Sequence, residues 1–479
     1  MSSSVIPPRL SKSALAHLPA AVERPRYDLD EVEVGIVHFG PGAFHRAHQA
    51  WYFDDALAFD RRWAISAVSL RSASLCNALA PQDGLYTVAV LAEQTQYRVI
   101  GALRERIIAA KERERVFARL AAPATHIVTL TVTEKGYCLR ADGALDFSHP
   151  DIAADLASPH APASVVGHIV EGLRLRRAAG LAPFTTISCD NLADNGGKLG
   201  RAVVALARAR DAGLADWIET EAAFPRTMVD SIVPATDTAL EQHIACAIGV
   251  ADAWPVQREV FAQWVIEDRF CSAAPDFARI GVTVTGDVAG YERAKLCLLN
   301  AAHSTLAYLG LLSGIETVAD AMRDSGLADF VETLMREHIK PSIEVPPGFD
   351  IDAYIDQVLA RFRNPAMHHR LAQIACDGSQ KLPFRLLGTI RTTLAAKRPI
   401  DSLSIPIAAW FHFVRRAQRD GVKLVDPLAD ELEHVAAGCN GEAAHDVPRL
   451  LALRQVFADD LPRDAVFAAA LRAAYEACA

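Results

Sequence analysis

The sequence lacks several features that would assign it to a familiar class. Its nine cysteines form no CxxC pair and no zinc-ligand spacing, and the N-terminal stretch MSSSVIPPRLSKSALAHLP lacks the apolar run of a signal peptide. These absences argue against a disulfide scaffold and favour reduced thiols in a cytoplasmic protein. The formal net charge is −9. A nucleic-acid surface would normally be basic, so no nucleic-acid partner is expected.

Long hydrophobic runs are also scarce. Only the segment 296–315 approaches the length of a membrane span, and it contains Asn300, His303 and Ser304. Such groups are costly in lipid, so a buried helix is favoured and no membrane partner is expected. Hydrophobic residues make up 51% of the chain and charged residues 22%, which is typical of a globular protein. A length of 479 residues predicts two or three domains.

The first part of the chain alternates strand-like and helix-like segments. Apolar β-rich runs occur at 32–40, 63–70, 125–134 and 184–191, and a helical pattern occupies 163–180. Buried strands separated by amphipathic helices predict a mostly parallel, Rossmann-type α/β sheet. The stretch 84–103 instead predicts an antiparallel hairpin after the second strand.

The second part of the chain is almost purely helical in pattern. Apolar residues recur three and four apart within 317–338, 349–363, 382–397 and 464–478. We therefore expect an α/β Rossmann-type domain over 1–286 and a mostly α-helical domain over 287–479.

A candidate dinucleotide-binding turn follows the first strand, in GIVHFGPGAFHRAHQ. Gly40 and Gly42 supply the GxG of the fingerprint, which lets the backbone approach a pyrophosphate, but His45 stands in place of the third glycine. A plain strand–helix turn is the alternative. Two histidines three residues apart, His45 and His48, could share a helix face and a metal, but no third ligand is evident, so no metal is expected. The candidate cofactor contacts here are Phe39, Gly40, Gly42, Phe44, His45 and Arg46.

The second strand ends in AVSLRS, without the acidic residue that usually reads the ribose of NAD. Ser69 and Arg71 are the candidate cofactor contacts at this position. NAD is the expected cofactor, with NADP left open, and a solvated surface arginine is the alternative interpretation of Arg71.

Polar residues also follow other strands. Asp190 and Asn191 lie at the end of the run FTTISCDN, and Thr133 and Glu134 lie at the end of THIVTLTVTE. Asp230 lies at the end of a third strand-like run, FPRTMVD. Open α/β sheets bind ligands at the carboxyl ends of their strands, although each residue is also a common turn or capping residue.

One apolar helix, in YERAKLCLLNAAHS, carries Glu292, Lys295, Asn300 and His303. At roughly 100° per residue these side chains fall within an arc of about 140°. Each has a structural alternative, such as a snorkelling lysine or a satisfied core histidine. Together, on a helix at a domain boundary, they favour a site, because clefts between domains are preferred ligand sites.

This constellation suits the oxidation of a secondary alcohol. A desolvated lysine can take the hydroxyl proton, and the amides of Asn191 and Asn300 can donate to the developing alkoxide. Two alternatives stay open: Lys295 as a Schiff-base nucleophile, and a nucleotide-binding regulator without turnover.

The chain resembles the mannitol 2-dehydrogenase family of zinc-independent, long-chain polyol dehydrogenases. The resemblance rests on GIVHFGPGAFHRAHQA, TVTEKGY, SCDNLADNG, FPRTMVDSIVP, QWVIED, KLCLLNAAHS and DGSQKLP. It implies a Rossmann-type domain followed by a helical domain. It also implies Lys295 as general base, Asn191 and Asn300 as the polarising pair, His303 as a substrate-orienting group, Glu292 in proton movement, and Asp230 and Lys381 as substrate contacts.

Within this family, TVTEKGYC, EGLRLRR and QIACDGSQKLPFR are more similar to the branch of D-mannonate oxidoreductases, also called fructuronate reductases. Several polyol enzymes have an arginine where Gln373 stands. A uronate needs a cation for its carboxylate, and Lys381 and Arg385 are four residues apart, so they can share a helix face. A solvated Arg385 remains the alternative. Mannitol and arabinitol remain alternative substrates, and a monomer or small homo-oligomer is expected.

Overall fold

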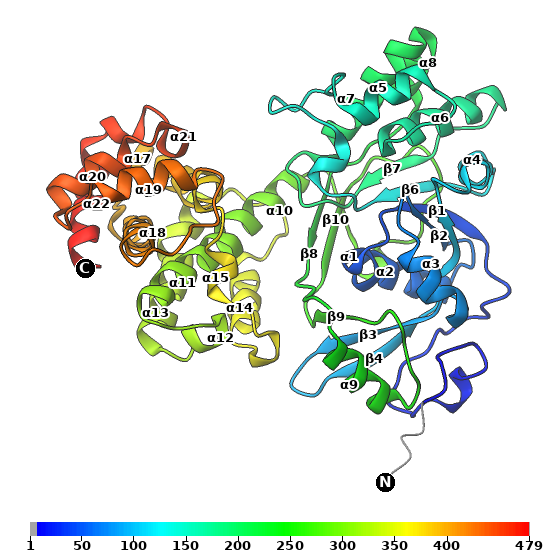
Figure 1. The fold of residues 1–479 in the computed structure, drawn as a ribbon, viewed down its shortest axis with the longest axis horizontal. Helices are drawn as coiled ribbons and strands as arrows, with labels where there is room; N and C mark the ends of the chain where they lie inside the picture. Colours follow the sequence, from blue (N-terminus) through cyan, green and yellow to red (C-terminus); the bar gives the residue numbers. More distant parts are fainter. Residues whose placement is uncertain (1–6, 479) are drawn as a thin grey trace. The chain divides into compact units, whose positions relative to one another are not determined.

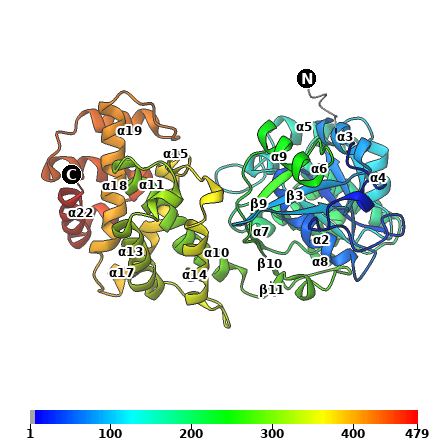
Figure 2. The same cartoon turned by 90° about the horizontal axis from the view of Figure 1, so that it is seen from below.

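The computed structural model describes residues 7–478. The chain divides into two compact units, Met1–Val288 and Ala289–Ala479, which we call the N-terminal and C-terminal units (Figures 1 and 2). The sequence placed the domain boundary between Gly286 and Asp287.

The N-terminal unit is built on a five-stranded sheet in the order β5-β2-β1-β6-β7, with every neighbouring pair parallel. Its strands are β1 (Val34–Phe39), β2 (Ala64–Ser69), β5 (Leu103–Ile108), β6 (Ile127–Leu130) and β7 (Thr185–Ser188). Taken in chain order this arrangement is 3-2-1-4-5, the usual Rossmann order. The strand order reverses between β1 and β6, and ligands bind such sheets at the carboxyl ends flanking that reversal. The predicted Rossmann-type sheet is confirmed.

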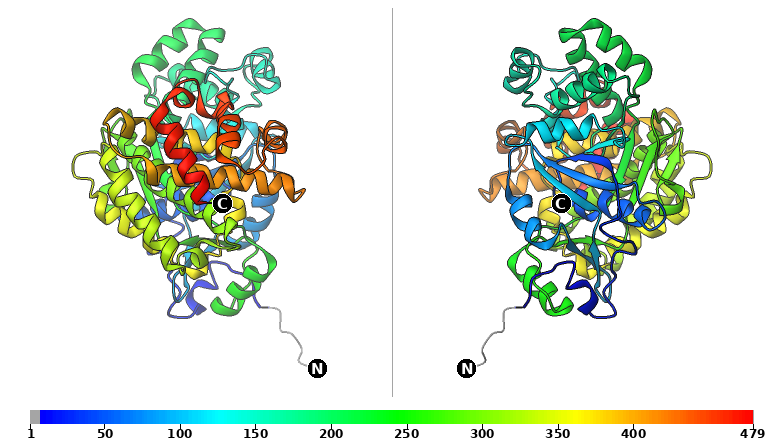
Figure 3. Two further views of the ribbon diagram at one scale, coloured as in Figure 1. Left: turned by 90° about the vertical axis from the view of Figure 1, so that its left-hand side faces the viewer. Right: turned by 90° about the vertical axis from the view of Figure 1, so that its right-hand side faces the viewer.

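Helices cover both faces of this sheet, which explains why the residues of β1, β6 and β7 are buried on both faces. Ile36 belongs to the cluster that packs on α1 (Ala43–Ala47) and α2 (Gln49–Leu57). Its neighbour Val37 faces the opposite cluster, with α6 (Val165–Ala178) and α7 (Asn195–Arg210) (Figure 1). In the right-hand view of Figure 3 the blue strands of the sheet face the viewer. The remaining helices of the unit are α3 (Ser74–Leu79), α4 (Arg113–Leu120), α5 (Pro150–Ala157), α8 (Ala212–Glu221) and α9 (Thr238–Ile248).

Two small sheets accompany the main one. The predicted hairpin is confirmed, since β3 (Tyr86–Leu91) pairs antiparallel with β4 (Gln96–Ile100), and β9 (Val256–Glu259) joins β3. The other sheet has the order β11-β10-β8 and contains β8 (Thr227–Asp230), β10 (Gln263–Glu267) and β11 (Thr283–Thr285). The strand-like run ending at Asp230 is therefore a strand of a separate sheet.

The sequence did not identify β5. This strand follows β4 closely, and Arg104, Glu105 and Arg106 interrupt its apolar residues. It lies at the edge of the main sheet, where one flank carries no further strand. Polar residues are tolerated at an edge, so hydrophobicity alone misses such a strand.

The C-terminal unit is helical, as predicted (Figure 2). It begins in α10 (Val288–Ala294), and its longer helices are α11 (Ala301–Leu312), α13 (Ser325–Thr333), α14 (Ile351–Phe362), α17 (Gly388–Ala395), α18 (Asp401–Arg419), α19 (Ala429–Ala437), α20 (Ala443–Leu451) and α22 (Ala465–Ala477). The shorter ones are α12 (Val318–Ala321), α15 (Leu371–Ile374), α16 (Gly378–Leu382) and α21 (Arg454–Phe457). Three turns are π-helical: Lys295–Asn300, Leu334–Ile339 and Pro383–Leu387.

Most of the apolar segment 296–315 lies in one continuous helical run, 288–312, which contains the π-helical turn Lys295–Asn300 and ends at Leu312. Within residues 7–478, none of the helices combines the length and apolar character that a bilayer crossing requires.

We predict that the buried ion pair between Asp54 on α2 and Arg98 on β4 stabilises the N-terminal unit. The carboxylate of Asp54 lies 2.6 Å from Arg98 Nη2 and accepts the Gly101 N–H, with only 1% of its side chain exposed. Asp54→Ala removes one of the two carboxylates that pair with the buried Arg98 and leaves Asp55 as the other. The free energy of unfolding, measured by urea titration, should therefore fall by about 3 kcal/mol. Glu31→Ala, which removes an exposed pair with Arg61, should cost under about 1 kcal/mol. Equal losses in the two variants would contradict this prediction.

Candidate active site

The turn after β1 fits a dinucleotide. Gly40 has φ +84°, and a Cβ atom there would lie 2.2 Å from the carbonyl oxygen of Thr131, directly after β6. Only glycine permits this approach of the two strand ends. Gly42 caps α1 and is open, because a Cβ there would have the Gly40 oxygen, 3.8 Å away, as its nearest neighbour. The turn therefore offers bare backbone where strand order reverses, the place at which a pyrophosphate is bound in Rossmann sheets.

The histidines of this turn lie in separate environments. α1 ends at Ala47, and His48 leaves helical geometry with φ −120° and ψ −84° before α2 begins. His45 is fully buried and stacks on His38, with ring centroids 3.3 Å apart. His48 Nε2 lies 3.0 Å from the Gln263 carbonyl oxygen. Among residues 7–478 the two histidines belong to no three-residue group of metal-ligating side chains.

Other predicted residues of the turn are turned inward. Phe39 is the buried last residue of β1, and Phe44 on α1 stacks on His48 at 5.0 Å. Arg46 is 5% exposed and donates from Nη1 to the Trp254 carbonyl, while its own carbonyl accepts the Tyr86 hydroxyl at 2.8 Å. Arg46 thus joins α1 to the sheet of β3 and β9.

The carboxyl end of β2 carries Ser69 and then Arg71. Arg71 is exposed, and its Nη2 lies 2.9 and 2.8 Å from the two carboxylate oxygens of Asp151 in the first turn of α5. No local sequence pattern indicates this partner, because 80 residues separate the two side chains.

The carboxyl end of β6 is strained. Thr133 has φ +66° and ψ 165°, a region that is almost exclusive to glycine and costs about 1–3 kcal/mol. The carboxylate of Asp190 holds it there, accepting the N–H groups of Val132 at 3.1 Å and Thr133 at 2.9 Å and the Tyr137 hydroxyl at 2.7 Å. Glu134 follows as the exposed first residue of a 3₁₀ turn. Such strain clusters at functional sites.

The supporting role of Asp190 and Tyr137 was missed from sequence. The signal was Asp190 itself, near the end of the run FTTISCDN, but its partners Val132, Thr133 and Tyr137 come from the segment after β6. Asn191 follows and is exposed. Asn195 then fixes this segment, donating from Nδ2 to the carbonyl oxygens of Asp190 at 3.0 Å and Thr227 at 3.1 Å. Asp230 ends β8 and is 5% exposed.

In the C-terminal unit, Lys295 and Asn300 begin and end a π-helical turn. The expectation of a regular α-helix is wrong here. In an α-helix, residues five apart point about 140° apart. A π turn closes its hydrogen bonds between residues five apart, so Lys295 and Asn300 come nearer to one face. Lys295 is 9% exposed, and Asn300 and Glu292 are half-buried.

His303 lies one turn further along, on α11. Its ring packs on Phe362 at 4.5 Å and His369 at 5.2 Å between centroids. Burial, together with the nearby charges of His369, Arg361 and Arg385, holds the pKa of His303 well below its usual range. His303 is therefore a neutral imidazole, and its Nε2 has no hydrogen-bond partner among the residues described.

Lys381 lies on α16, and Arg385 lies on the π turn Pro383–Leu387 that directly follows it. Lys381 Nζ lies 2.6 Å from the Cys376 carbonyl oxygen and 3.8 Å from a carboxylate oxygen of Asp377. Arg385 Nη1 donates to the Asn300 carbonyl at 3.3 Å and to Ser304 Oγ at 2.9 Å. Burial lowers the pKa values of both side chains. Within the described chain, Arg385 forms no ion pair with any carboxylate.

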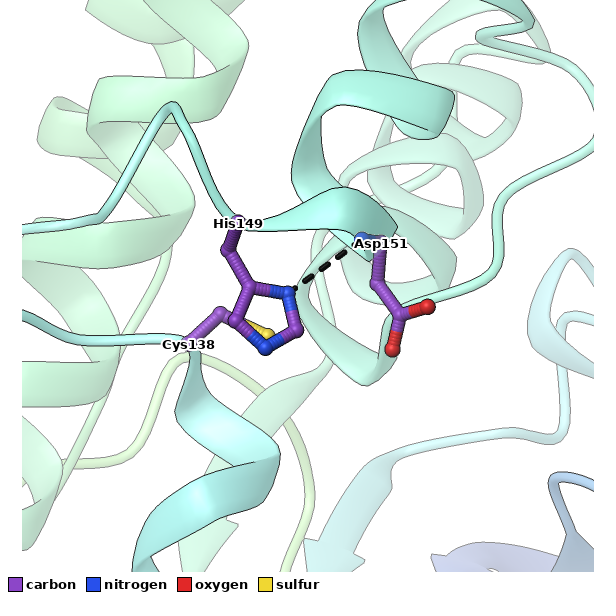
Figure 4. A group of neighbouring side chains, drawn as sticks. All are labelled: Cys138, His149 and Asp151. Carbon is purple, nitrogen blue, oxygen red and sulfur yellow. Dashed lines mark hydrogen bonds between the residues drawn. The ribbon is translucent and has the colours of Figure 1, made fainter.

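A separate group, Cys138, His149 and Asp151, has potential ligand atoms within 4.8 Å of one another (Figure 4). A metal does not fit it well. His149 Nδ1 accepts the Asp151 N–H at 3.2 Å, which leaves the neutral ring's proton on Nε2. Asp151 is already paired with Arg71. Burial and neighbouring carboxylates raise the pKa of the Cys138 thiol to about 11, which disfavours the thiolate that a metal requires.

The fold and the turn after β1 define a dinucleotide-binding oxidoreductase with a helical second unit. Family comparison agrees: residues 34–279 match the mannitol dehydrogenase Rossmann domain, and residues 287–479 match the mannitol dehydrogenase C-terminal domain. The chain belongs to the mannitol dehydrogenase family of NAD(P)-dependent secondary-alcohol dehydrogenases, which confirms the predicted family and enzyme class.

Three relatives illustrate this likeness. D-mannonate oxidoreductase of Escherichia coli (strain K12) is 43% identical over 470 residues, which cover 96% of each chain. Mannitol 2-dehydrogenase of Pseudomonas fluorescens, solved as a ternary complex with NAD and D-mannitol, is 36% identical with a TM-score of 0.81, covering 98% of this chain and 96% of that one. A D-sorbitol dehydrogenase in substrate-free form is 34% identical with a TM-score of 0.91, covering 98% and 97%.

We predict that the buried histidine stack makes the N-terminal unit sensitive to acid. Burial lowers the pKa of His38 to about 3, and burial with the charges of His38, Arg46 and His48 puts the pKa of His45 well below its usual range. The unfolded chain therefore binds these protons more readily. Stability is fully present above about pH 6.5 and is lost as pH falls below it.

His45→Phe keeps a stacking ring and removes the titration without losing a hydrogen bond, because neither ring nitrogen of His45 has a partner among the described residues. The free energy of unfolding lost between pH 7 and pH 5 should shrink by about 2 kcal/mol. The control is His243→Phe, at an exposed histidine on α9. An undiminished acid loss in His45→Phe would show that this imidazole is not responsible.

Proposed function

We propose that the protein transfers a hydride between NAD and the secondary alcohol of a sugar acid, with D-mannonate and D-fructuronate as the preferred pair. The observation that carries the proposal is Arg385, a half-buried guanidinium without a carboxylate partner in the described chain. Its hydrogen bonds to a carbonyl and a hydroxyl leave its charge uncompensated. Because an uncompensated buried charge is costly, a substrate carboxylate is a favourable partner.

Neighbouring charges support an anionic substrate. Arg385 lowers the pKa of Lys381, after burial, so the two cations interact. The acidic neighbours of Lys381 are Asp377, 3.8 Å away, and Asp426, whose charge also acts on the lysine. A neutral polyol would leave the charge of Arg385 without a counterion, whereas a sugar acid supplies one negative charge. The 43% identity to a D-mannonate oxidoreductase also favours the sugar acid.

In the C-terminal unit, Lys295 takes the proton of the reacting hydroxyl, and Glu292 accepts a proton from the lysine in turn. The side-chain amide of Asn300 donates to the oxygen as negative charge builds on it. In the N-terminal unit, the amide of Asn191 is proposed for the same kind of donation. The neutral ring of His303 orients a substrate hydroxyl, and Asp230 accepts a hydrogen bond from another.

The cofactor is assigned to the turn after β1 and the neighbouring strand ends. Bound NAD would supply the hydride acceptor for the oxidation. The bare backbone of Gly40 and Gly42 would receive the pyrophosphate, with Phe44, Thr133 and Glu134 beside it, and the buried Phe39 would support the turn from below. His45 and Arg46 act on the cofactor through the shape of the turn, since both are buried. Ser69 and Arg71 face the ribose end.

Lys295→Ala should lower kcat by at least about 100-fold while the Kd for NADH, measured by fluorescence, changes less than threefold, because a general base contributes about 10²–10⁴. Lys423→Ala, at an exposed lysine of the same unit, should leave both quantities unchanged. Near-normal turnover of the Lys295 variant at every pH would remove the lysine from its assigned role.

A substrate panel tests the sugar acid. The wild-type protein should oxidise D-mannonate with a higher kcat/KM than D-mannitol or D-arabinitol. Arg385→Met should lower kcat/KM for D-mannonate by about 10–100-fold, the worth of a charge-assisted hydrogen bond, and change that for D-mannitol much less.

The ratio of the two kcat/KM values distinguishes recognition from general damage, because misfolding lowers both together. The matched control is Arg391→Met, which removes an arginine of α17 that pairs with Asp460. A wild-type preference for the neutral polyols would refute the sugar-acid assignment and leave the family unchanged.

A further inference from the structure

The carboxyl end of β2 has an unusual charge arrangement. In Rossmann sheets this position commonly carries an acidic residue, which hydrogen-bonds the ribose 2′-hydroxyl of NAD and repels the 2′-phosphate of NADP. Here β2 ends at Ser69, which has no charge, and a cation follows at Arg71. Considered alone, this strand end would accept a 2′-phosphate, because arginine binds phosphate through charge-assisted hydrogen bonds.

A carboxylate from another element forms an ion pair with Arg71. Asp151 lies in the first turn of α5, on the crossover between β6 and β7, and both of its carboxylate oxygens lie within 2.9 Å of Arg71 Nη2. The backbone of Asp151 is fixed, because its N–H donates to Nδ1 of the capping residue His149 (Figure 4). The Arg71 side chain is 72% exposed and the Asp151 side chain 31% exposed, so an approaching ligand can reach the pair.

We infer that Asp151 determines the choice of cofactor by holding Arg71, so that the protein favours NAD over NADP. This inference rests on the proposed NAD-dependent function and adds a residue to it. A 2′-phosphate would have to displace Arg71 from Asp151 and then lie close to the Asp151 carboxylate. A 2′-hydroxyl is neutral and meets neither obstacle. Asp151 thus supplies, from a distant part of the chain, the negative charge that β2 lacks.

The ion pair is well suited to a test, because exposed ion pairs contribute little to stability. Asp151→Asn keeps the size of the side chain, frees Arg71 and removes the negative charge. The matched control is Asp142→Asn. It removes the same charge from another exposed pair, with Arg140, in the segment that precedes α5. The melting temperature of each variant establishes that the fold is retained.

The experiment measures Kd for NADH and NADPH by fluorescence, and kcat/KM with NAD and NADP on D-mannonate. The wild type and Asp142→Asn should favour the unphosphorylated cofactor. Asp151→Asn should raise NADPH affinity relative to NADH at least tenfold, and the double variant Arg71→Ala/Asp151→Asn should lose that gain.

An unchanged ratio in Asp151→Asn would overturn the inference. So would a gain that persists in the double variant, because Arg71 would then take no part. The binding measurements need no turnover and therefore test Asp151 even if the substrate is misassigned. Failure of the wild type to oxidise D-mannonate while it binds NADH refutes the proposed substrate instead.

Discussion

The hydrogen bond from Arg385 to the carbonyl oxygen of Asn300 joins the two features on which the proposed chemistry depends. One is the π-helical turn that brings Lys295 and Asn300 toward the same face, and the other is the cation assigned to the substrate carboxylate. A π turn departs from the ordinary i→i+4 ladder and is common at functional sites. Arg385 itself lies in another π turn, Pro383–Leu387, that packs against the first. The positions of Lys295, Asn300 and Arg385 therefore depend on one another.

A similar dependence governs the cofactor end of the N-terminal unit. Gly40 can lie against the Thr131 carbonyl only because it has no side chain, and Thr133 holds a backbone conformation that few residues adopt. Asp190 stabilises that strained turn with three accepted hydrogen bonds. Its position directly before Asn191 connects the geometry of the cofactor turn to that of a proposed catalytic amide.

Much of this organisation could be predicted from the sequence. Four strands of the main sheet are continuous apolar runs because both of their faces are buried, so β1, β2, β6 and β7 were identified. The hairpin β3–β4 and the helical second unit followed from local pattern. β5 was missed because an edge strand tolerates the charged residues that hide it. The π turn was also missed, since its residues are good formers of an ordinary helix and only packing selects the wider turn.

The sequence by itself determined the elements whose signals are local: the apolar strands, the GxG turn, and the lysine, asparagine and histidine along one apolar helix. The tertiary structure alone decided which distant groups meet. Arg385 reaches a carbonyl 85 residues away, Asp190 holds a turn more than 50 residues before it, and Asp151 engages Arg71 across 80 residues. The physical reason is that hydrophobic periodicity reports how each segment is buried, whereas an ion pair or hydrogen bond between segments depends on how the whole unit packs.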